Sequence, residues 1–198
     1  GAEDPVVSAN EIRLPAGSRS ELKLNANGYI HAFWIPALGG KTDMIPGRET
    51  RMSLEPEKPG EYRGQCAEFC GESHARMAFR AVVMEPDAFA DWLERQAEPA
   101  VSPKGEEAER GRDIFNREGC GACHTVRGMS ASGKLGPDLT HLGGRRSLAA
   151  GVLPMERDAL EQWLRDPENI KPDARMPGYD HLSPSDLTAL ATFLEGLK

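Results

Sequence analysis

The 198-residue sequence predicts two domains, a β-rich first half and a helical second half. Apolar and polar residues alternate with a period of two in the first half, whereas apolar residues recur at helical spacing in the second. Between the halves lies AEPAVSPKGEE, which has two prolines, a glycine and no apolar periodicity. We therefore expect domains at residues 1–97 and 107–198, joined by a flexible linker at residues 98–106.

The strands of the first half are short and separated by turns. EIRLPAG, ELKLNAN and MAFRAVVM (residues 77–84) alternate apolar and polar side chains, and turns rich in proline and glycine separate such runs. This pattern is typical of a small sandwich or barrel. PDAFADWLERQ then predicts a helix with Asp87 as its N-cap and one apolar face made by Phe89, Trp92 and Leu93.

The helices of the second half have clearer ends. EEAERGRDIFN predicts a first helix that ends near Gly119. SPSDLTALATFLEGLK predicts the last helix, with Ser183 at the N-cap, Pro184 at the first helical position and Asp186 at the third. Its apolar stripe consists of Leu187, Leu190, Ala191 and Leu194.

Charge and hydropathy exclude two classes of function. The net charge is −7 and no basic stripe is present, so nucleic acid, whose phosphates would repel the chain, is not an expected partner. No apolar run approaches the ~20 residues that span a bilayer. We expect membrane attachment only through an N-terminal anchor that this sequence lacks.

The four cysteines form two close pairs, Cys66 with Cys70 and Cys120 with Cys123. Two disulfides would be the ordinary interpretation for an exported chain. Each pair, however, has a histidine beside it, which indicates cofactor ligands.

The second pair lies in CGACH, where Cys120, Cys123 and His124 have the spacing of a covalent haem site. Two thiols at this spacing reach the two vinyl groups of haem, and the adjacent imidazole reaches the iron. The alternative is a redox or zinc pair followed by a chance histidine. That alternative predicts a βαβ setting or a second C-x-x-C motif, and the sequence has neither.

With this motif at its centre, the second half as a whole resembles the class I cytochrome c family, which implies an all-α fold. ARMPGY places Met176 before Pro177, where the family has its sixth iron ligand. LGPDL places the Pro137 carbonyl where it would accept the other N–H of His124. The resemblance also puts Arg145 near a haem propionate and Trp163 on the methionine side of the ring.

Two axial ligands leave the iron no open site, which favours electron transfer over oxygen chemistry. His141 and His181 match no ligand position, and we interpret both as surface residues.

The first pair lies in GQCAEFCGESHARM, residues 64–77. A Cys66–Cys70 disulfide would leave His74 and Met77 unexplained, and zinc has no need of methionine. A single blue copper would leave one cysteine surplus. Two copper ions bridged by both sulfurs would use both cysteines, and His31 is the one remaining histidine of the first half.

The first half resembles the binuclear copper (CuA) domain of cytochrome c oxidase subunit II, which implies an all-β cupredoxin-like sandwich. The pattern H…C-x-E-x-C-x₃-H-x₂-M carries the resemblance, together with HAFWIP and KTDMIPGR. In that family the glutamate binds one copper through its carbonyl, and its carboxylate holds magnesium in the assembled complex. The implied copper ligands are His31, Cys66, Glu68, Cys70, His74 and Met77, with Glu68 also the magnesium ligand.

These resemblances imply an electron-transfer subunit of a respiratory terminal oxidase on the outer, periplasmic or extracellular face of the cytoplasmic membrane. Electrons would pass from an external cytochrome or quinol-oxidising complex to haem c, then to the copper pair, then to catalytic subunit I. Oxygen reduction would belong to the assembled complex. The alternatives are the electron-entry subunit of a nitric oxide reductase, a copper-delivery protein with a fused haem domain, and a zinc-stapled binding module.

Overall fold

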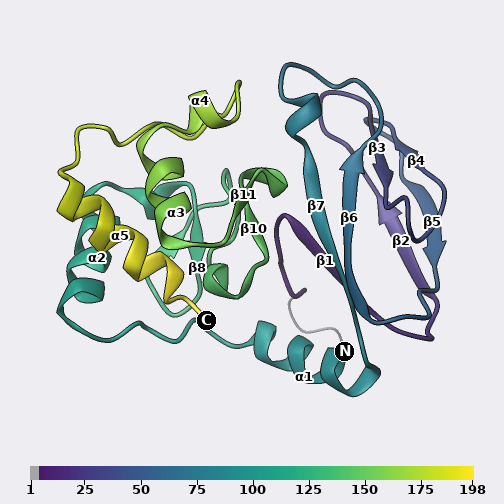
Figure 1. Ribbon diagram of the computed structural model, residues 1–198, viewed down its shortest axis with the longest axis horizontal. Coiled ribbons are helices and arrows are strands. Elements are labelled where there is room, and N and C mark those ends of the chain that lie inside the picture. The colour runs from purple at the N-terminus through teal and green to yellow at the C-terminus, as the bar shows by residue number, and fades with distance from the viewer. Residues whose placement is uncertain (1–4) are drawn as a thin grey trace. The chain divides into compact units, whose positions relative to one another are not determined.

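A computed structural model describes residues 5–198 as two compact units (Figure 1). One consists mainly of Asn10–Trp92, and the other mainly of Leu93–Ala149 and Leu153–Lys198. Within residues 5–198 no helix is both long enough and apolar enough to cross a lipid bilayer.

The first unit is built of strands in two ladders. A five-stranded sheet has the order β1-β7-β6-β3-β4, and β2 pairs with β5 in a second ladder. β1 and β7 run parallel, and the other neighbours run antiparallel. The strands are β1 (Glu11–Pro15), β2 (Ser20–Leu24), β3 (His31–Trp34), β4 (Thr42–Met44), β5 (Thr50–Leu54), β6 (Gly60–Cys66) and β7 (Ala78–Met84). These bounds confirm the β-rich first half and its three predicted strands.

Side chains from both ladders form one apolar core. Leu14 of β1, Leu54 of β5 and Val83 of β7 are at most 4% exposed and belong to the same cluster. The rings of Phe33 and Phe79 stack beside it, with centroids 4.7 Å apart. Burial of such side chains contributes about 1.5–3 kcal/mol each, so this core holds the two ladders together.

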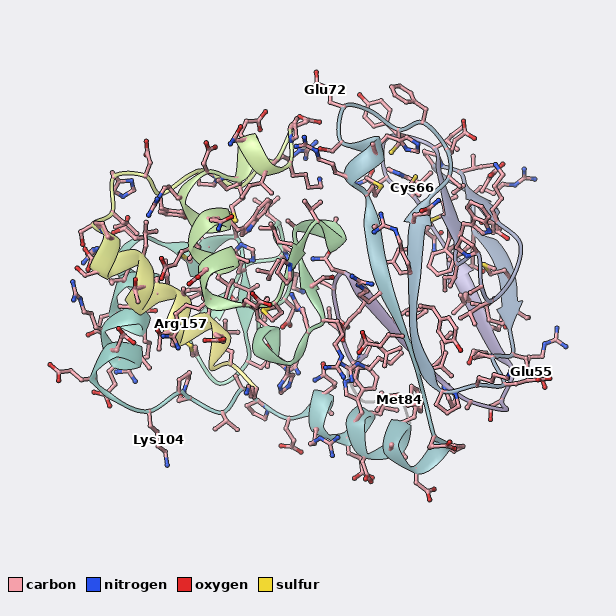
Figure 2. The ribbon with its side chains drawn as sticks, viewed as in Figure 1. Glu55, Cys66, Glu72, Met84, Lys104 and Arg157 are labelled. Atoms are coloured by element: carbon pink, nitrogen blue, oxygen red, sulfur yellow. The ribbon has the colours of Figure 1, made fainter. Side chains whose placement is uncertain are left out.

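The register of β3 and β6 brings distant parts of the chain together at one end of the sheet. Phe33 pairs with Cys66, so the start of β3 lies beside the loop that follows β6. The Ala67 N–H donates to the Ala32 carbonyl at 3.0 Å and extends this contact. Figure 2 shows Cys66 near the loop that carries Glu72, at the opposite end of the unit from Glu55 and Met84.

In the part of the second unit that the structure describes, four complete helices follow the end of α1 (Pro86–Ala97). α2 packs against α5, where a Cβ on Gly111 would lie 2.0 Å from the Ala189 carbonyl oxygen, so only glycine permits this approach. Phe115 and Phe193 meet at the same contact, with ring centroids 5.6 Å apart. The helices are α2 (Glu106–Arg117), α3 (Arg157–Arg165), α4 (Pro167–Ile170) and α5 (Pro184–Glu195).

The all-α description of this unit is not confirmed, because two small antiparallel ladders lie between its helices. β8 (Thr125–Val126) pairs with β9 (Ala131–Ser132), and β10 (Ser147–Leu148) pairs with β11 (Leu153–Pro154). Runs of two residues are too short to show a period in the sequence. The short 3₁₀ turns of the chain are η1 (His74–Arg76), η2 (Cys120–Ala122), η3 (Leu142–Gly144) and η4 (Ala149–Gly151).

Two predicted helix caps have different outcomes. The Ser183 hydroxyl accepts the Asp186 N–H at 3.1 Å, which confirms the predicted start of α5. The prediction for Asp87 was wrong: α1 (Pro86–Ala97) already begins at Pro86. The Phe89 N–H donates to the Glu85 carbonyl at 2.9 Å, so Asp87 falls inside the first turn.

The chain between α1 and α2 is hydrogen-bonded to the helical unit. The Ala100 N–H donates to the Arg127 carbonyl and the Val101 N–H donates to the Lys198 carbonyl, each at 3.0 Å. The His141 ring nitrogen Nε2 lies 3.0 Å from the Glu98 carbonyl oxygen.

Candidate copper and haem sites

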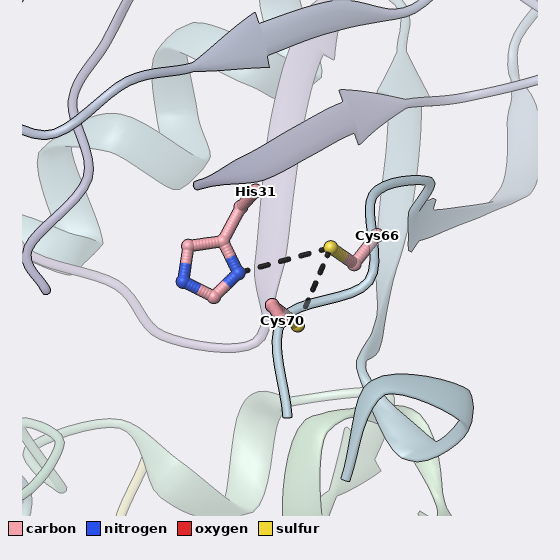
Figure 3. A group of neighbouring side chains, drawn as sticks. All are labelled: His31, Cys66 and Cys70. Carbon is pink, nitrogen blue, oxygen red and sulfur yellow. Dashed lines mark hydrogen bonds between the residues drawn. The ribbon is translucent and has the colours of Figure 1, made fainter. Parts of the chain in front are cut away.

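Two cysteines and a histidine form a compact cluster at the end of the sheet (Figure 3). Cys66 Sγ lies 3.7 Å from His31 Nδ1 and 3.8 Å from Cys70 Sγ. All three side chains are partly buried, and their ligand atoms lie within 4.8 Å of one another. Residues that are far apart in the sequence thus meet at one point.

Three more predicted ligands surround the same two sulfurs. Cys70 Sγ lies 3.6 Å from His74 Nδ1 and 3.8 Å from Met77 Sδ. The Glu68 carbonyl oxygen lies 3.3 Å from Cys66 Sγ. Each sulfur therefore has one imidazole and one weaker donor beside it. The structure brings together all six residues that the sequence singled out.

Local backbone bonds explain why the loop closes in this way. The Cys66 N–H donates to the Met77 carbonyl at 2.9 Å, which joins the two ends of the loop. The His74 N–H donates to the Gly71 carbonyl at 3.0 Å, and η1 then turns the chain toward Met77. Side chains at both ends and in the middle of the loop consequently converge.

The arrangement of the two cysteines suits a copper site better than a disulfide bond. The two sulfurs are 3.8 Å apart, whereas a disulfide requires about 2.05 Å. Metal–sulfur bonds of about 2.3 Å allow one ion to contact both sulfurs at this separation. Thiolate and thioether sulfur with imidazole are donors that copper accepts readily. The residues present therefore fit copper.

Two neighbours of this cluster, Phe69 and Lys41, were not singled out by the sequence. The Phe69 ring lies 5.7 Å from the His74 ring, and Phe69 is 77% exposed. The Glu68 carboxylate lies 3.9 Å from Lys41 Nζ, although its backbone carbonyl faces Cys66. The two ends of Glu68 therefore have different partners. Phe69 stands between Glu68 and Cys70, and that position was the available signal.

The second cysteine pair lies in a single tight turn. The Cys123 N–H and the His124 N–H both donate to the Cys120 carbonyl, at 3.2 and 3.0 Å. η2 occupies the first part of this turn, and Gly119 before it adopts a left-handed φ of 72°. One turn therefore carries both thiols and the imidazole.

The predicted partner of His124 is in place. Nδ1 of His124 lies 2.7 Å from the Pro137 carbonyl oxygen. A carbonyl only accepts, so Nδ1 carries the proton and Nε2 keeps its lone pair for a metal ion. Gly136 leaves room for the ring, because a Cβ there would lie 2.4 Å from Cε1 of His124. This geometry fits an axial haem ligand.

The other predicted haem residues lie in the same unit. Met176 and Trp163 are half-buried and pack against its apolar core. Arg145 is 8% exposed and donates from Nη2 to the Asp138 carbonyl. His141 and His181 bond to groups outside the haem motif, His181 with Nε2 at 3.2 Å from Glu118 Oε2.

Tyr179 was not predicted as a site residue. Its hydroxyl lies 3.9 Å from Cys120 Sγ. Burial raises the pKa of Tyr179 to about 12 and also raises the pKa of the Cys120 thiol, so both groups stay neutral at physiological pH. The available signal was an aromatic residue three positions after Met176.

Two family models match this chain. The periplasmic domain of cytochrome c oxidase subunit II matches residues 5–85, and cytochrome c matches residues 108–198. The first range contains the whole sulfur cluster, and the second contains the whole haem motif. The models therefore indicate a cupredoxin-like β domain followed by a cytochrome c domain.

Curated relatives are similar along nearly the whole chain. Cytochrome c oxidase subunit 2 of Alkalihalophilus pseudofirmus is 37% identical over 191 residues, which are 96% of this chain and 55% of the relative. The Bacillus subtilis protein of the same name is 32% identical over 203 residues, 98% of this chain and 57% of the relative. The chain thus spans little more than half the length of these relatives.

One solved structure is similar to part of the chain. The periplasmic domain of subunit II of cytochrome oxidase of Bradyrhizobium japonicum is 38% identical, covering 44% of this chain and 64% of that one, with a TM-score of 0.43.

Proposed function

Because this chain is homologous to cytochrome c oxidase subunit II, with the periplasmic domain of that subunit followed by a cytochrome c domain, we propose that it carries electrons into a respiratory terminal oxidase. The observation that carries the proposal is the arrangement of four donor groups, two beside each of two cysteine sulfurs that lie 3.8 Å apart. A cytochrome c domain on the same chain gives such a copper site an electron donor.

The sulfur cluster would hold a binuclear copper centre. Cys66 and Cys70 would both bridge the two ions, since neither sulfur is engaged in a disulfide. The geometry supports one imidazole and one weak donor for each ion: His31 with the Glu68 carbonyl, and His74 with Met77.

The helical unit would hold haem c covalently. Cys120 and Cys123 would form the thioether bonds, and His124 and Met176 would be the axial ligands. The Pro137 carbonyl would hold the His124 tautomer and raise the basicity of the ring. Arg145 and Trp163 would act at the rim and face of the macrocycle.

When bound, the copper pair and the haem supply two centres that each accept and release one electron. The chain's own residues hold the donor atoms in place. Cys66 and Met77 are joined by a backbone hydrogen bond, and the β3–β6 register fixes His31. Donors held in this way move little when the charge changes, which favours rapid electron transfer.

The partners proposed are an external donor, either a cytochrome or a quinol-oxidising complex, and the catalytic subunit I that reduces oxygen. The domain would lie on the outer face of the cytoplasmic membrane, anchored by a segment preceding this sequence. The Glu68 carboxylate would bind magnesium in the assembled complex, in exchange for its contact with Lys41.

The proposal is tested by loading the purified chain with copper and attaching haem, followed by metal analysis and EPR. We expect two copper ions per iron and a signal from one unpaired electron shared by both coppers. One copper ion per chain, or a Cys66–Cys70 disulfide that persists under reducing conditions, would disprove the respiratory assignment. A labile, colourless Cu(I) site would instead indicate copper delivery.

A further inference from the structure

Arg127 lies three residues after His124 and contacts the chain between α1 and α2. Its Nη2 donates to the Gln96 carbonyl, at the C-terminal end of α1, and to the Glu98 carbonyl at 3.2 Å. The last carbonyls of a helix have no partner within the helix, so a guanidinium there satisfies acceptors and interacts favourably with the helix dipole.

The same guanidinium also contacts the segment that orients the haem ligand. Nη1 of Arg127 lies 3.3 Å from Oδ2 of Asp138, whose side chain is 11% exposed. Asp138 directly follows Pro137, whose carbonyl accepts the His124 Nδ1–H. The other carboxylate oxygen of Asp138 accepts the Thr140 N–H at 2.8 Å, which holds the carboxylate in position.

The Arg127 backbone is tied to the same two segments. Its N–H donates to Oγ1 of Thr140 at 3.0 Å, and its carbonyl accepts the Ala100 N–H at 3.0 Å. One residue therefore contacts the linker and the segment after Pro137 through both its side chain and its backbone. The guanidinium directs two separate nitrogens to acceptors on its two sides, whereas a lysine would have to reach both sides from one ammonium nitrogen.

We propose that Arg127 is a positioning residue that couples the linker to the orientation of His124. The proposal rests on the proposed function, since it takes His124 to be the iron ligand. The Arg127–Asp138 pair keeps the Pro137 carbonyl on Nδ1–H, which makes the imidazole more basic and stabilises oxidised iron. The same side chain holds the Gln96 and Glu98 carbonyls, so the end of α1 and the start of the linker belong to the surface of the haem domain.

The two roles are separable by mutation of the full chain with haem attached. In Arg127→Gln we expect a higher midpoint potential of the haem and about tenfold faster amide exchange at Ala100, as for one lost hydrogen bond. Arg127→Lys keeps the charge and should give smaller changes in both measurements. His141→Ala removes only the contact with Glu98, so exchange at Ala100 should rise while the potential stays constant.

Arg157→Gln is the matched control, because it removes an exposed ion pair with Glu195 in the same domain. Neither measurement should change in this variant. Haem attached normally, with the wild-type potential and exchange rate in Arg127→Gln, would overturn the inference. If the wild-type chain attaches no haem, the proposed function is disproved. Amide exchange at Ala100 in the variants still tests the linker contact. If Arg127→Gln does not fold, unchanged values in Arg127→Lys overturn the inference.

Discussion

The sulfur of Cys70 is surrounded by three other predicted copper ligands. It lies within 3.6–3.8 Å of Cys66, His74 and Met77. Replacing the thiol by a hydroxyl removes a bridging donor and leaves one sulfur for two ions. We expect Cys70→Ser to lower copper binding from two ions per chain to one or none, measured by metal analysis.

The control is Glu72→Gln, an exposed change in the same loop. It should leave copper content and the EPR spectrum unchanged. A Cys70→Ser chain that still binds two coppers and keeps a shared unpaired electron would show that this sulfur is not a bridge.

Gly136 controls the space available to the proximal imidazole. A Cβ there would lie 2.4 Å from Cε1 of His124, well inside van der Waals contact. Since Nδ1 of this ring is held by Pro137, the ring cannot move without losing that hydrogen bond. We expect Gly136→Ala to cost about 1–3 kcal/mol of unfolding free energy and to lower haem content.

Chemical denaturation and the absorbance of attached haem measure these two effects. Gly144→Ala is the matched control, because a Cβ on Gly144 meets no atom within 4 Å. Equal stability and haem content in the two variants would mean that the contact with His124 is relieved without cost.

At the scale of elements, Glu118 links the end of α2 to the loop that follows Met176. Its carboxylate lies 2.9 Å from Nε of Arg117 and 3.2 Å from Nε2 of His181. The hydrogen bond from Arg117, and to a smaller extent that from His181, lowers the pKa of Glu118. A lowered carboxyl pKa means that the ion pair stabilises the fold above the unfolded-state pKa, and that this stabilisation is lost as the pH falls through the lowered value.

We therefore expect Glu118→Gln to destabilise the haem domain by less than about 1 kcal/mol at pH 7, since both partners are exposed. The difference from wild type should vanish at a pH below the lowered pKa, where the wild-type carboxyl is also neutral. Denaturant midpoints followed by haem absorbance across this range measure it. Asp113→Asn, an exposed change on the same helix, should show no such pH dependence, and an equal loss at both pH extremes would contradict the ion-pair explanation.

The elements also show what the sequence could and could not reveal. Ser183 was predictable because capping depends on side chains within four residues, and α5 begins as expected. Asp87 was misplaced because a helix can begin with Pro86 and a bond to Glu85, which needs no side-chain cap. The two-residue strands of the second unit were missed because their pairing depends on tertiary contacts.

The copper site shows the same division. The ligands from Cys66 to Met77 are close in sequence, and the backbone bond between these two residues brings their side chains together. His31 is 35 positions from Cys66, and it was found only from the count of available histidines and from the family resemblance around HAFWIP. The β3–β6 register that brings it near is not encoded in any short motif. Arg127 gave no signal, because a single arginine after a haem motif has no characteristic partner in the sequence.

For the whole molecule, the question is what the connection between the domains contributes to electron transfer. Both halves are acidic and the net charge is −7, so charge attraction would do little to bring separate pieces together. A tether instead gives an effective concentration on the order of mM. Residues 96–101 remain hydrogen-bonded to the helical unit, so a cut beyond them would leave part of this connection in place.

We expect a chain cleaved between Lys104 and Gly105, at ~10 µM, to oxidise its haem up to roughly 100-fold more slowly than the intact chain once the pieces separate, because that concentration is about 100-fold below the tethered value. The rate of haem oxidation in the cleaved chain should fall on dilution. In cleaved Arg127→Gln it should fall at a higher protein concentration, because the linker then has fewer contacts with the haem domain. Flash-initiated haem oxidation over a dilution series measures both effects, with the uncleaved proteins as controls. Rates that stay independent of concentration even where the cleaved pieces have separated would show that covalent tethering contributes nothing. Rates that fall on dilution with the same curve in both cleaved proteins would show that Arg127 does not hold the linker.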